Sequence, residues 1–165
     1  ETIKELIIIL LVAISLLYFI LAAQFESIIQ PLIILSEIVV DVFFVLLGLW
    51  LFGESLNIMS MIGLVVMSGI IINDSILKVD TINRLRKQGM PVLKAVFAGG
   101  HSRLKPIIMT SLTTILAIAP FLNRVDMGSD LQYPLSLSII IGMTVGTLIS
   151  LFFIPLIYYI IYRKR

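Results

Sequence analysis

The chain has 165 residues, of which 59% are hydrophobic and only 13% charged, and its formal net charge is +2. A soluble domain is about half apolar and about a quarter charged, so this composition excludes one and indicates an integral membrane protein. Cysteine is absent, which excludes disulfide bonds and thiolate metal sites. The chain opens Glu1-Thr2-Ile3 without a methionine, and the first apolar run lacks signal-peptide features, so we expect a piece of a longer protein.

Five apolar segments follow one another along the chain, and each is close to the roughly 20 residues that cross a bilayer. They cover approximately residues 6–23, 31–52, 58–79, 106–122 and 134–162. The last is long enough to tilt, and Pro155 is expected to kink it. The predicted fold is therefore all-α, a polytopic bundle of five transmembrane helices that forms a single domain over residues 1–165.

The connection between the third and fourth segments is strongly basic. Its lysines and arginines are Lys78, Arg84, Arg86, Lys87, Lys94, Arg103 and Lys105. Within it, residues 91–98 predict a short amphipathic helix on the membrane surface, with Pro91 at its first position and Gly99-Gly100 at its end. Basic loops remain on the cytoplasmic side, so this loop and the basic C-terminus, two spans later, are both expected there. The N-terminus is then expected outside.

Ionisable residues inside the apolar segments are the candidate functional residues. A carboxylate at the centre of a membrane helix costs about 2.5–3.5 kcal/mol on insertion scales, so it is expected to have a partner or a function. Counting about 1.5 Å per residue from the basic side places polar groups of the second, third and fourth segments in one layer of the membrane. The candidates are Glu37, Asp41, Asn73, Asp74, Lys78 and Thr110.

Two interpretations of this layer remain open. In the first, the acids form a relay that loads and releases protons or cations, because burial disfavours the charged form of a carboxyl group. In the second, the residues are structural. Lys78 then pairs with Asp74 one turn away and extends to the surface, while Glu37 and Asp41 are neutral acids hydrogen-bonded between helices.

Other sites are not expected. His101 is predicted to be a surface residue, because the chain has no cysteine or second histidine to complete a metal site. We find no glycine-rich phosphate-binding loop, so ATP hydrolysis is not predicted. We also predict that the chain is not an enzyme and binds no cofactor. The basic loop is expected to contact lipid head groups and not nucleic acid.

Two longer stretches carry a resemblance to a known family: Gly69-Ile-Ile-Ile-Asn-Asp-Ser-Ile-Leu77 and Arg103-Leu-Lys-Pro-Ile-Ile-Met-Thr-Ser-Leu112, supported by residues 21–27, 117–121 and 152–155. They resemble the resistance-nodulation-division (RND) efflux transporters, in particular the multidrug-exporter branch. The resemblance implies that the chain is the last five of twelve transmembrane helices, in the inner membrane of a Gram-negative bacterium. It also implies a proton/substrate antiporter, a homotrimer coupled to a periplasmic adaptor and an outer-membrane channel.

The resemblance also implies roles for individual residues. The family moves protons through two aspartates of its first half, a lysine on the tenth helix and a threonine on the eleventh. Thr110 stands at the threonine position, whereas the lysine position falls on Asn73 and the asparagine that follows it is Asp74. Lys78, one turn further, is the nearest substitute, and Glu37 and Asp41 are additional acids. The resemblance thus implies a proton path of altered composition.

Two alternative functions, from classes other than efflux transport, remain open. An intramembrane aspartyl protease uses two aspartates that share a proton, and Asp41 and Asp74 lie on neighbouring segments. Against it, that family's Gly-x-Gly-Asp motif is absent, because Asp74 follows Ile-Ile-Asn. The other is a non-transporting scaffold or sterol-sensing relative that shares the helix bundle.

Overall fold

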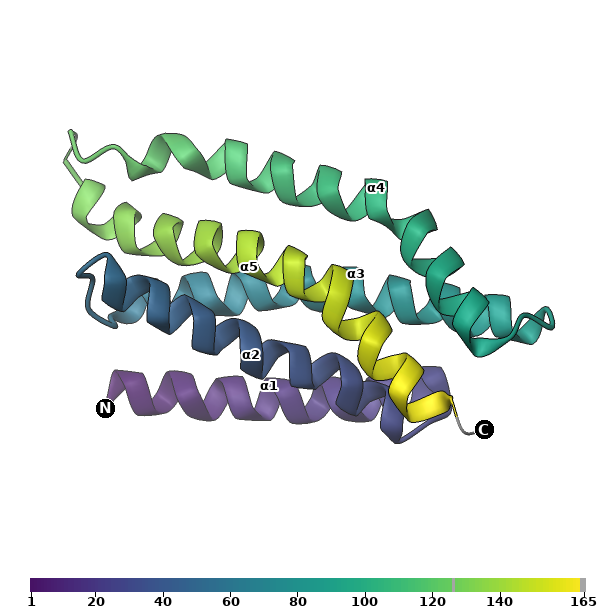
Figure 1. The fold of residues 1–165 in the computed structure, drawn as a ribbon. Coiled ribbons are helices and arrows are strands. Elements are labelled where there is room, and N and C mark those ends of the chain that lie inside the picture. The colour runs from purple at the N-terminus through teal and green to yellow at the C-terminus, as the bar shows by residue number, and fades with distance from the viewer. Residues whose placement is uncertain (126, 164–165) are drawn as a thin grey trace.

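A computed structural model describes residues 1–125 and 127–163. In this part of the chain five long helices run alternately up and down, and each is long and apolar enough to cross a membrane (Figure 1). They are α1 (Thr2–Phe25), α2 (Ile29–Leu51), α3 (Ile58–Lys87), α4 (Val92–Ile118) with the 3-10 turn η1 (Ala119–Leu122), and α5 (Ser129–Tyr162). The predicted all-α fold is confirmed, and the helices overlap the five predicted segments.

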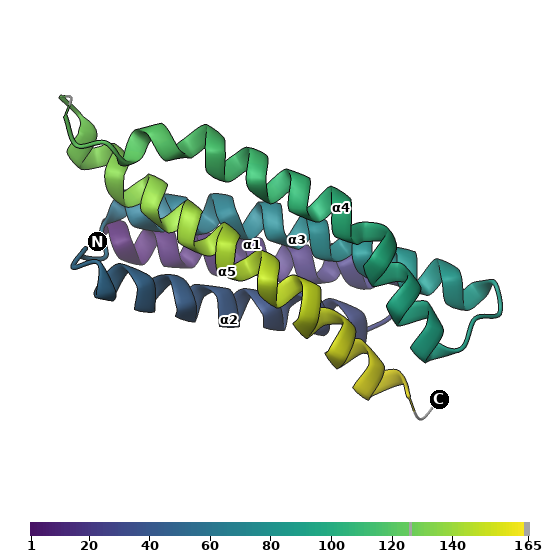
Figure 2. The same cartoon turned by 45° about the horizontal axis from the view of Figure 1, so that its top comes forward.

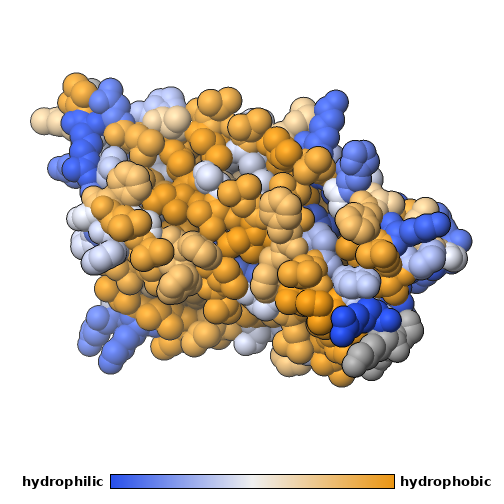
Figure 3. All heavy atoms as spheres, in the orientation of Figure 1, coloured by the Kyte–Doolittle hydropathy of each residue, from blue (hydrophilic) through white to orange (hydrophobic). Residues whose placement is uncertain are grey.

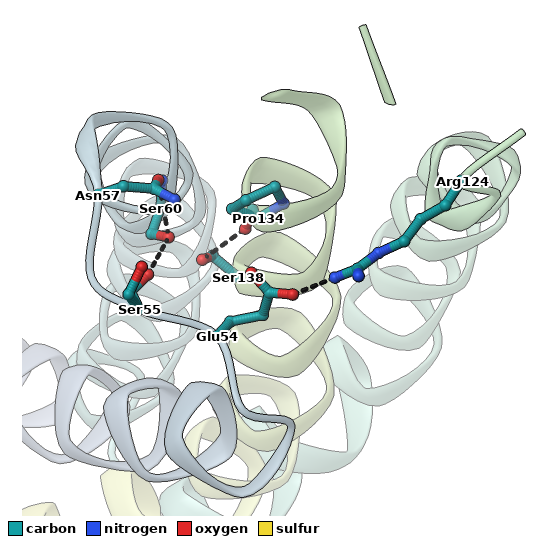
Figure 4. Close-up of polar contacts among 7 residues, drawn as sticks. All are labelled: Glu54, Ser55, Asn57, Ser60, Arg124, Pro134 and Ser138. Atoms are coloured by element: carbon teal, nitrogen blue, oxygen red, sulfur yellow. Dashed lines mark hydrogen bonds and ion pairs between the residues drawn. The ribbon is translucent and has the colours of Figure 1, made fainter. Parts of the chain in front are cut away.

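Local sequence explains where α3 begins. Asn57 is the N-cap residue, and its side-chain oxygen accepts a hydrogen bond from the backbone N–H of Ser60 at 2.9 Å. This bond satisfies one of the N–H groups that the first turn of a helix leaves without a partner. The preceding turn contains Gly53 at a φ of 74°, a backbone conformation that glycine adopts without a Cβ penalty. The cap and the turn together reverse the chain between α2 and α3 (Figure 4).

The segment 91–98 does not form a separate helix that ends at Gly99-Gly100. It is the first part of α4, which continues through both glycines and through Pro106. Gly99 serves close packing instead of helix termination, because a Cβ there would lie 2.6 Å from the side chain of Ile82 on α3. Pro106 removes one helical hydrogen bond, and α4 bends along its length instead of stopping (Figures 1 and 2).

The helices α3 and α5 occupy the centre of the bundle, flanked by α2 and α4, while α1 packs on the outside against α2 and α3. We call the end that carries the α3–α4 connection and the C-terminal end of α5 the basic end. One apolar cluster lies toward it and includes Ile34, Val79 and Tyr158. A second apolar cluster lies toward the opposite end and includes Val45 and Met67.

The surface of the bundle is an apolar band with polar residues gathered at both ends (Figure 3). Large apolar side chains are exposed all along it, and α1 buries only Leu21 within the bundle. An exposed apolar surface of this extent is typical of a protein surrounded by lipid or by further transmembrane helices.

Candidate functional site

A layer of buried polar side chains separates the two apolar clusters. The spacing of four residues places Glu37 and Asp41 on the inner face of α2, and α3 and α5 present polar residues to the same level. Glu37 and Lys78 are 0% exposed, Asp41 1% and Asp74 8%. We call the following residues the polar layer: Glu37, Asp41, Asp74, Ser75, Lys78 and Ser150.

A chain of short polar contacts runs through this layer from an acid to a base. The hydroxyl of Ser75 donates a hydrogen bond to Oε2 of Glu37, and it lies 3.3 Å from the hydroxyl of Ser150. The Lys78 ammonium donates to the backbone carbonyl of Ser150 and lies 3.3 Å from its Oγ. Two serine hydroxyls therefore connect the Glu37 carboxyl group with the Lys78 ammonium, across three helices.

Three carboxyl oxygens in the layer are buried without a hydrogen-bond partner among the described residues: Oε1 of Glu37 and both oxygens of Asp41. Each buried polar group left without a partner costs about 1–3 kcal/mol, so such groups are rare in folded proteins. A stable fold would replace these acids with apolar residues. Buried ionisable residues of this kind make the layer the candidate functional site of the bundle.

Glycine on α5 provides the space for Asp41. A Cβ added at Gly146 would lie 3.2 Å from Oδ2 of Asp41 and would also collide with the side chain of Ile71. Gly146 precedes Ser150 by four residues, so both face the interior. Close approach of α5 to α2 and α3 at this glycine keeps the carboxyl group away from lipid.

Lys78 is the only basic residue of the polar layer, and its charge attracts both Glu37 and Asp74. Within residues 1–125 and 127–163, however, no ion pair joins Lys78 to a carboxylate. The same residues contain no group of three His, Cys, Asp or Glu side chains that could hold a metal ion.

The structure brings together four of the six predicted site residues and separates the other two. Asn73 and Thr110 are exposed on the surface of the bundle. The Thr110 hydroxyl donates to the backbone carbonyl of Pro106 at 3.0 Å, within its own helix. In their place, the polar layer contains Ser75 and Ser150, which the sequence prediction missed. The available signal was the spacing of small residues on α5, where Gly142, Gly146 and Ser150 recur every fourth position.

A second polar network lies at the basic end, one to two turns away from the layer. The side-chain amides of Gln30 and Asn83 exchange two hydrogen bonds, of 2.9 and 2.7 Å, and so connect α2 with α3. The Tyr158 hydroxyl on α5 donates to Oδ1 of Asn83 at 2.5 Å and accepts from Arg86 at 3.2 Å. This network fixes the three helices that carry the polar layer relative to each other.

At the opposite end an ion pair joins the two connections. Arg124, between α4 and α5, pairs with Glu54, between α2 and α3 (Figure 4). The guanidinium also lies 3.7 Å from the centre of the Tyr133 ring, a cation–π contact. These contacts lie outside the polar layer, and Glu54 and Arg124 therefore provide controls for substitutions within it.

The fold and the layer define a helical transmembrane protein whose interior carries ionisable residues of the kind that mark ion and substrate pathways. The model of the AcrB/AcrD/AcrF family matches residues 1–162. The chain belongs to this family of RND transporters.

Individual relatives agree with this assignment. The chain is 35% identical over 150 residues to the multidrug resistance protein MdtC of Erwinia amylovora, with 90% of this chain and 15% of that protein covered. It is 29% identical over 157 residues to the swarming motility protein SwrC of Bacillus subtilis, with 94% and 15% covered. A crystal structure of a heavy metal efflux pump superposes with a TM-score of 0.85 at 29% identity, over 96% of this chain and 16% of that one. The chain thus spans about 15% of the length of these relatives.

Proposed function

We propose that the chain is the C-terminal transmembrane part of an RND efflux pump that exports drugs or other small molecules by proton antiport. The polar layer is its proton relay. Family membership supports the transport function, and the observation that carries the relay is the connection from Glu37 through Ser75 and Ser150 to Lys78. Buried acids next to a buried lysine are the groups that membrane pumps use to bind and release protons.

Each residue has a specific role in this proposal. Glu37 and Asp41 bind protons, because their unpartnered oxygens are free to take one. Lys78 balances one negative charge and returns a proton through the serine hydroxyls, and Asp74 supports its charge from one turn away. Asn73 and Thr110, on the exposed surface, contact the helices of the remaining transporter, where the family carries its two aspartates.

The placement of the whole protein follows from the same proposal. The basic end faces the cytoplasm, in agreement with the distribution of lysine and arginine, and the bundle lies in the inner membrane of a Gram-negative bacterium. The complete transporter forms a homotrimer with a periplasmic adaptor and an outer-membrane channel. Because the family captures substrates mainly in its periplasmic part, the 165-residue chain does not transport by itself.

The test measures proton-driven export by the full-length transporter that contains this segment, reconstituted in proteoliposomes. Glu37→Gln and Asp74→Asn keep the side-chain shape but remove the ability to ionise. We expect each to reduce export by about a hundredfold or more, the scale on which positioned acids and bases contribute to proton transfer.

The matched control is Glu54→Gln, which removes a carboxylate at the opposite end of the bundle and is expected to retain export. Insertion and thermal stability of all variants are measured in parallel. If both Glu37→Gln and Asp74→Asn insert normally and export at the wild-type rate, the acids are structural and the relay proposal is wrong.

A further inference from the structure

Two cavities meet at the basic end of the bundle. The first has a volume of about 890 Å³ and is lined by polar residues from the ends of the helices, among them Arg86, Lys87 and Arg163. The second is an apolar groove of about 450 Å³ between α4 and α5. Leu93 and Tyr159 line both cavities, so the groove begins where the polar cavity ends.

The polar cavity carries an excess of positive charge. Two acidic residues also line it, Glu26 and Asp80, but Asp80 is paired with Arg84 at 3.0 Å. The guanidinium of Arg86 is held in place by the Tyr158 hydroxyl and by the Tyr162 ring, whose centre is 4.9 Å away. An arginine fixed in this way presents its remaining N–H groups to a phosphate at little entropic cost.

The groove has the dimensions and chemistry of a binding site for a hydrocarbon chain. Along α5 it extends from Leu151 to Tyr159, which corresponds to about 12 Å of helix. Its walls are mainly apolar, with His101 and Tyr159 as the polar side chains, and Phe97 and Phe152 are 70% and 72% exposed on the apolar band of the bundle. A ligand that fills both cavities needs a charged head group and an apolar chain. The two parts of the ligand would meet beside Leu93 and Tyr159.

We propose that the two cavities form one binding site for an anionic phospholipid. Its phosphate lies beside Arg86, Lys87 and Arg163, and one acyl chain lies in the groove between α4 and α5. Basic pockets next to transmembrane helices bind lipid head groups in this manner. The proposal does not depend on proton transport, so lipid binding and the relay can fail independently.

The test measures lipid retention by the purified protein with native mass spectrometry after detergent exchange. The probes are phosphatidylglycerol, phosphatidylcholine with the same acyl chains, and glycerol phosphate as a free head group. We expect phosphatidylglycerol to be retained more strongly than phosphatidylcholine. The double variant Lys87→Gln and Arg163→Gln is expected to reduce this preference, by about fivefold for each basic residue removed.

A second variant tests the groove. Gly100 lines it and has open space where a Cβ would lie, so the larger side chain of Gly100→Leu is expected to occupy part of the groove and to reduce retention of both lipids. Gly69→Leu is the matched control, because Gly69 is equally open but lines a different cavity, between α1, α2 and α3.

Three results would overturn the proposal: equal retention of the two lipids, unchanged retention in Gly100→Leu, or loss of retention in Gly69→Leu as large as in Gly100→Leu. Displacement of the lipid by equimolar glycerol phosphate would also overturn it, since the groove would then contribute nothing to binding.

Discussion

Asp41 combines almost complete burial, at 1% exposure, with two carboxyl oxygens that have no hydrogen-bond partner among the described residues. A leucine has nearly the same shape and would avoid the cost of a buried polar group, about 1–3 kcal/mol. The chain instead has an acid at this position, and the glycine at position 146 on α5 leaves space for the carboxyl group. At the scale of single residues, an apolar alternative to the polar layer would avoid this cost, which agrees with the functional role proposed for the layer.

Ser150 is the residue whose removal most directly tests the hydroxyl connection. Ser150→Ala deletes the hydroxyl between Ser75 and Lys78 but leaves the backbone carbonyl that also accepts from Lys78. We expect proton-coupled export by the full-length transporter to slow about tenfold, equivalent to roughly 1.4 kcal/mol in the barrier.

The control is Ser138→Ala. Ser138 is another buried serine on α5, and its hydroxyl donates to the carbonyl of Pro134 within its own helix (Figure 4). An equal loss of export in both variants would indicate general damage to α5 and not the interruption of a proton path.

The sequence identifies the acids and Lys78 because charged residues in an apolar segment are conspicuous. It does not identify Ser75 and Ser150, because serine is tolerated in membrane helices, where its hydroxyl can bond its own backbone. Nor does it determine that Thr110 faces outward. The rotation of a helix about its axis depends on packing against its neighbours, and α4 is apolar over most of its circumference within the membrane segment.

At the scale of helices, glycine residues allow particular pairs of helices to approach closely. Gly63 on α3 faces α5 so closely that a Cβ would lie 2.8 Å from the backbone oxygen of Leu135 and 2.9 Å from Cβ of Ser138. Because backbone atoms cannot move aside independently, an added methyl group must push the helices apart. The prediction that 91–98 ends at Gly99-Gly100 was wrong for the same reason: Gly99 is a packing residue, and sequence alone does not distinguish this role from helix termination.

Gly63→Ala is expected to lower the free energy of unfolding by about 1–3 kcal/mol, the usual cost of overpacking. Gly69→Ala, six residues later on the same helix, is the control. It has open space and should be neutral, or stabilising by up to about 1 kcal/mol through helix propensity. Thermal unfolding in detergent measures both, and a destabilised Gly69→Ala with an unaffected Gly63→Ala would contradict this account of the α3–α5 contact.

At the scale of the whole molecule, the apolar band and the two polar ends determine how the bundle lies in a membrane (Figure 3). The number of helices and the fold class follow from hydropathy, because each span must satisfy its own backbone in lipid. The contacts that fix the ends do not follow from hydropathy. Arg124 with Glu54, and Gln30 with Asn83, join residues far apart in the sequence.

The proposed orientation is directly testable because the chain contains no cysteine. Single cysteines are introduced at the exposed positions Ser55, in the α2–α3 connection, and Gln88, in the α3–α4 connection. In intact spheroplasts a membrane-impermeant maleimide should label Ser55→Cys, and it should label Gln88→Cys only after the membrane is permeabilised. The reverse pattern would place the basic end outside and contradict the proposed topology.

The composition of the polar layer also has a consequence for coupling stoichiometry. It contains three acids, Glu37, Asp41 and Asp74, and one base, Lys78. Electroneutrality is strongly favoured in a low-dielectric interior. With Lys78 charged, a neutral layer has one ionised acid and two protonated ones, so it holds two exchangeable protons. In the proposed relay, the number of protons moved in each transport cycle is therefore limited to the acids that are not needed to balance the charge of Lys78.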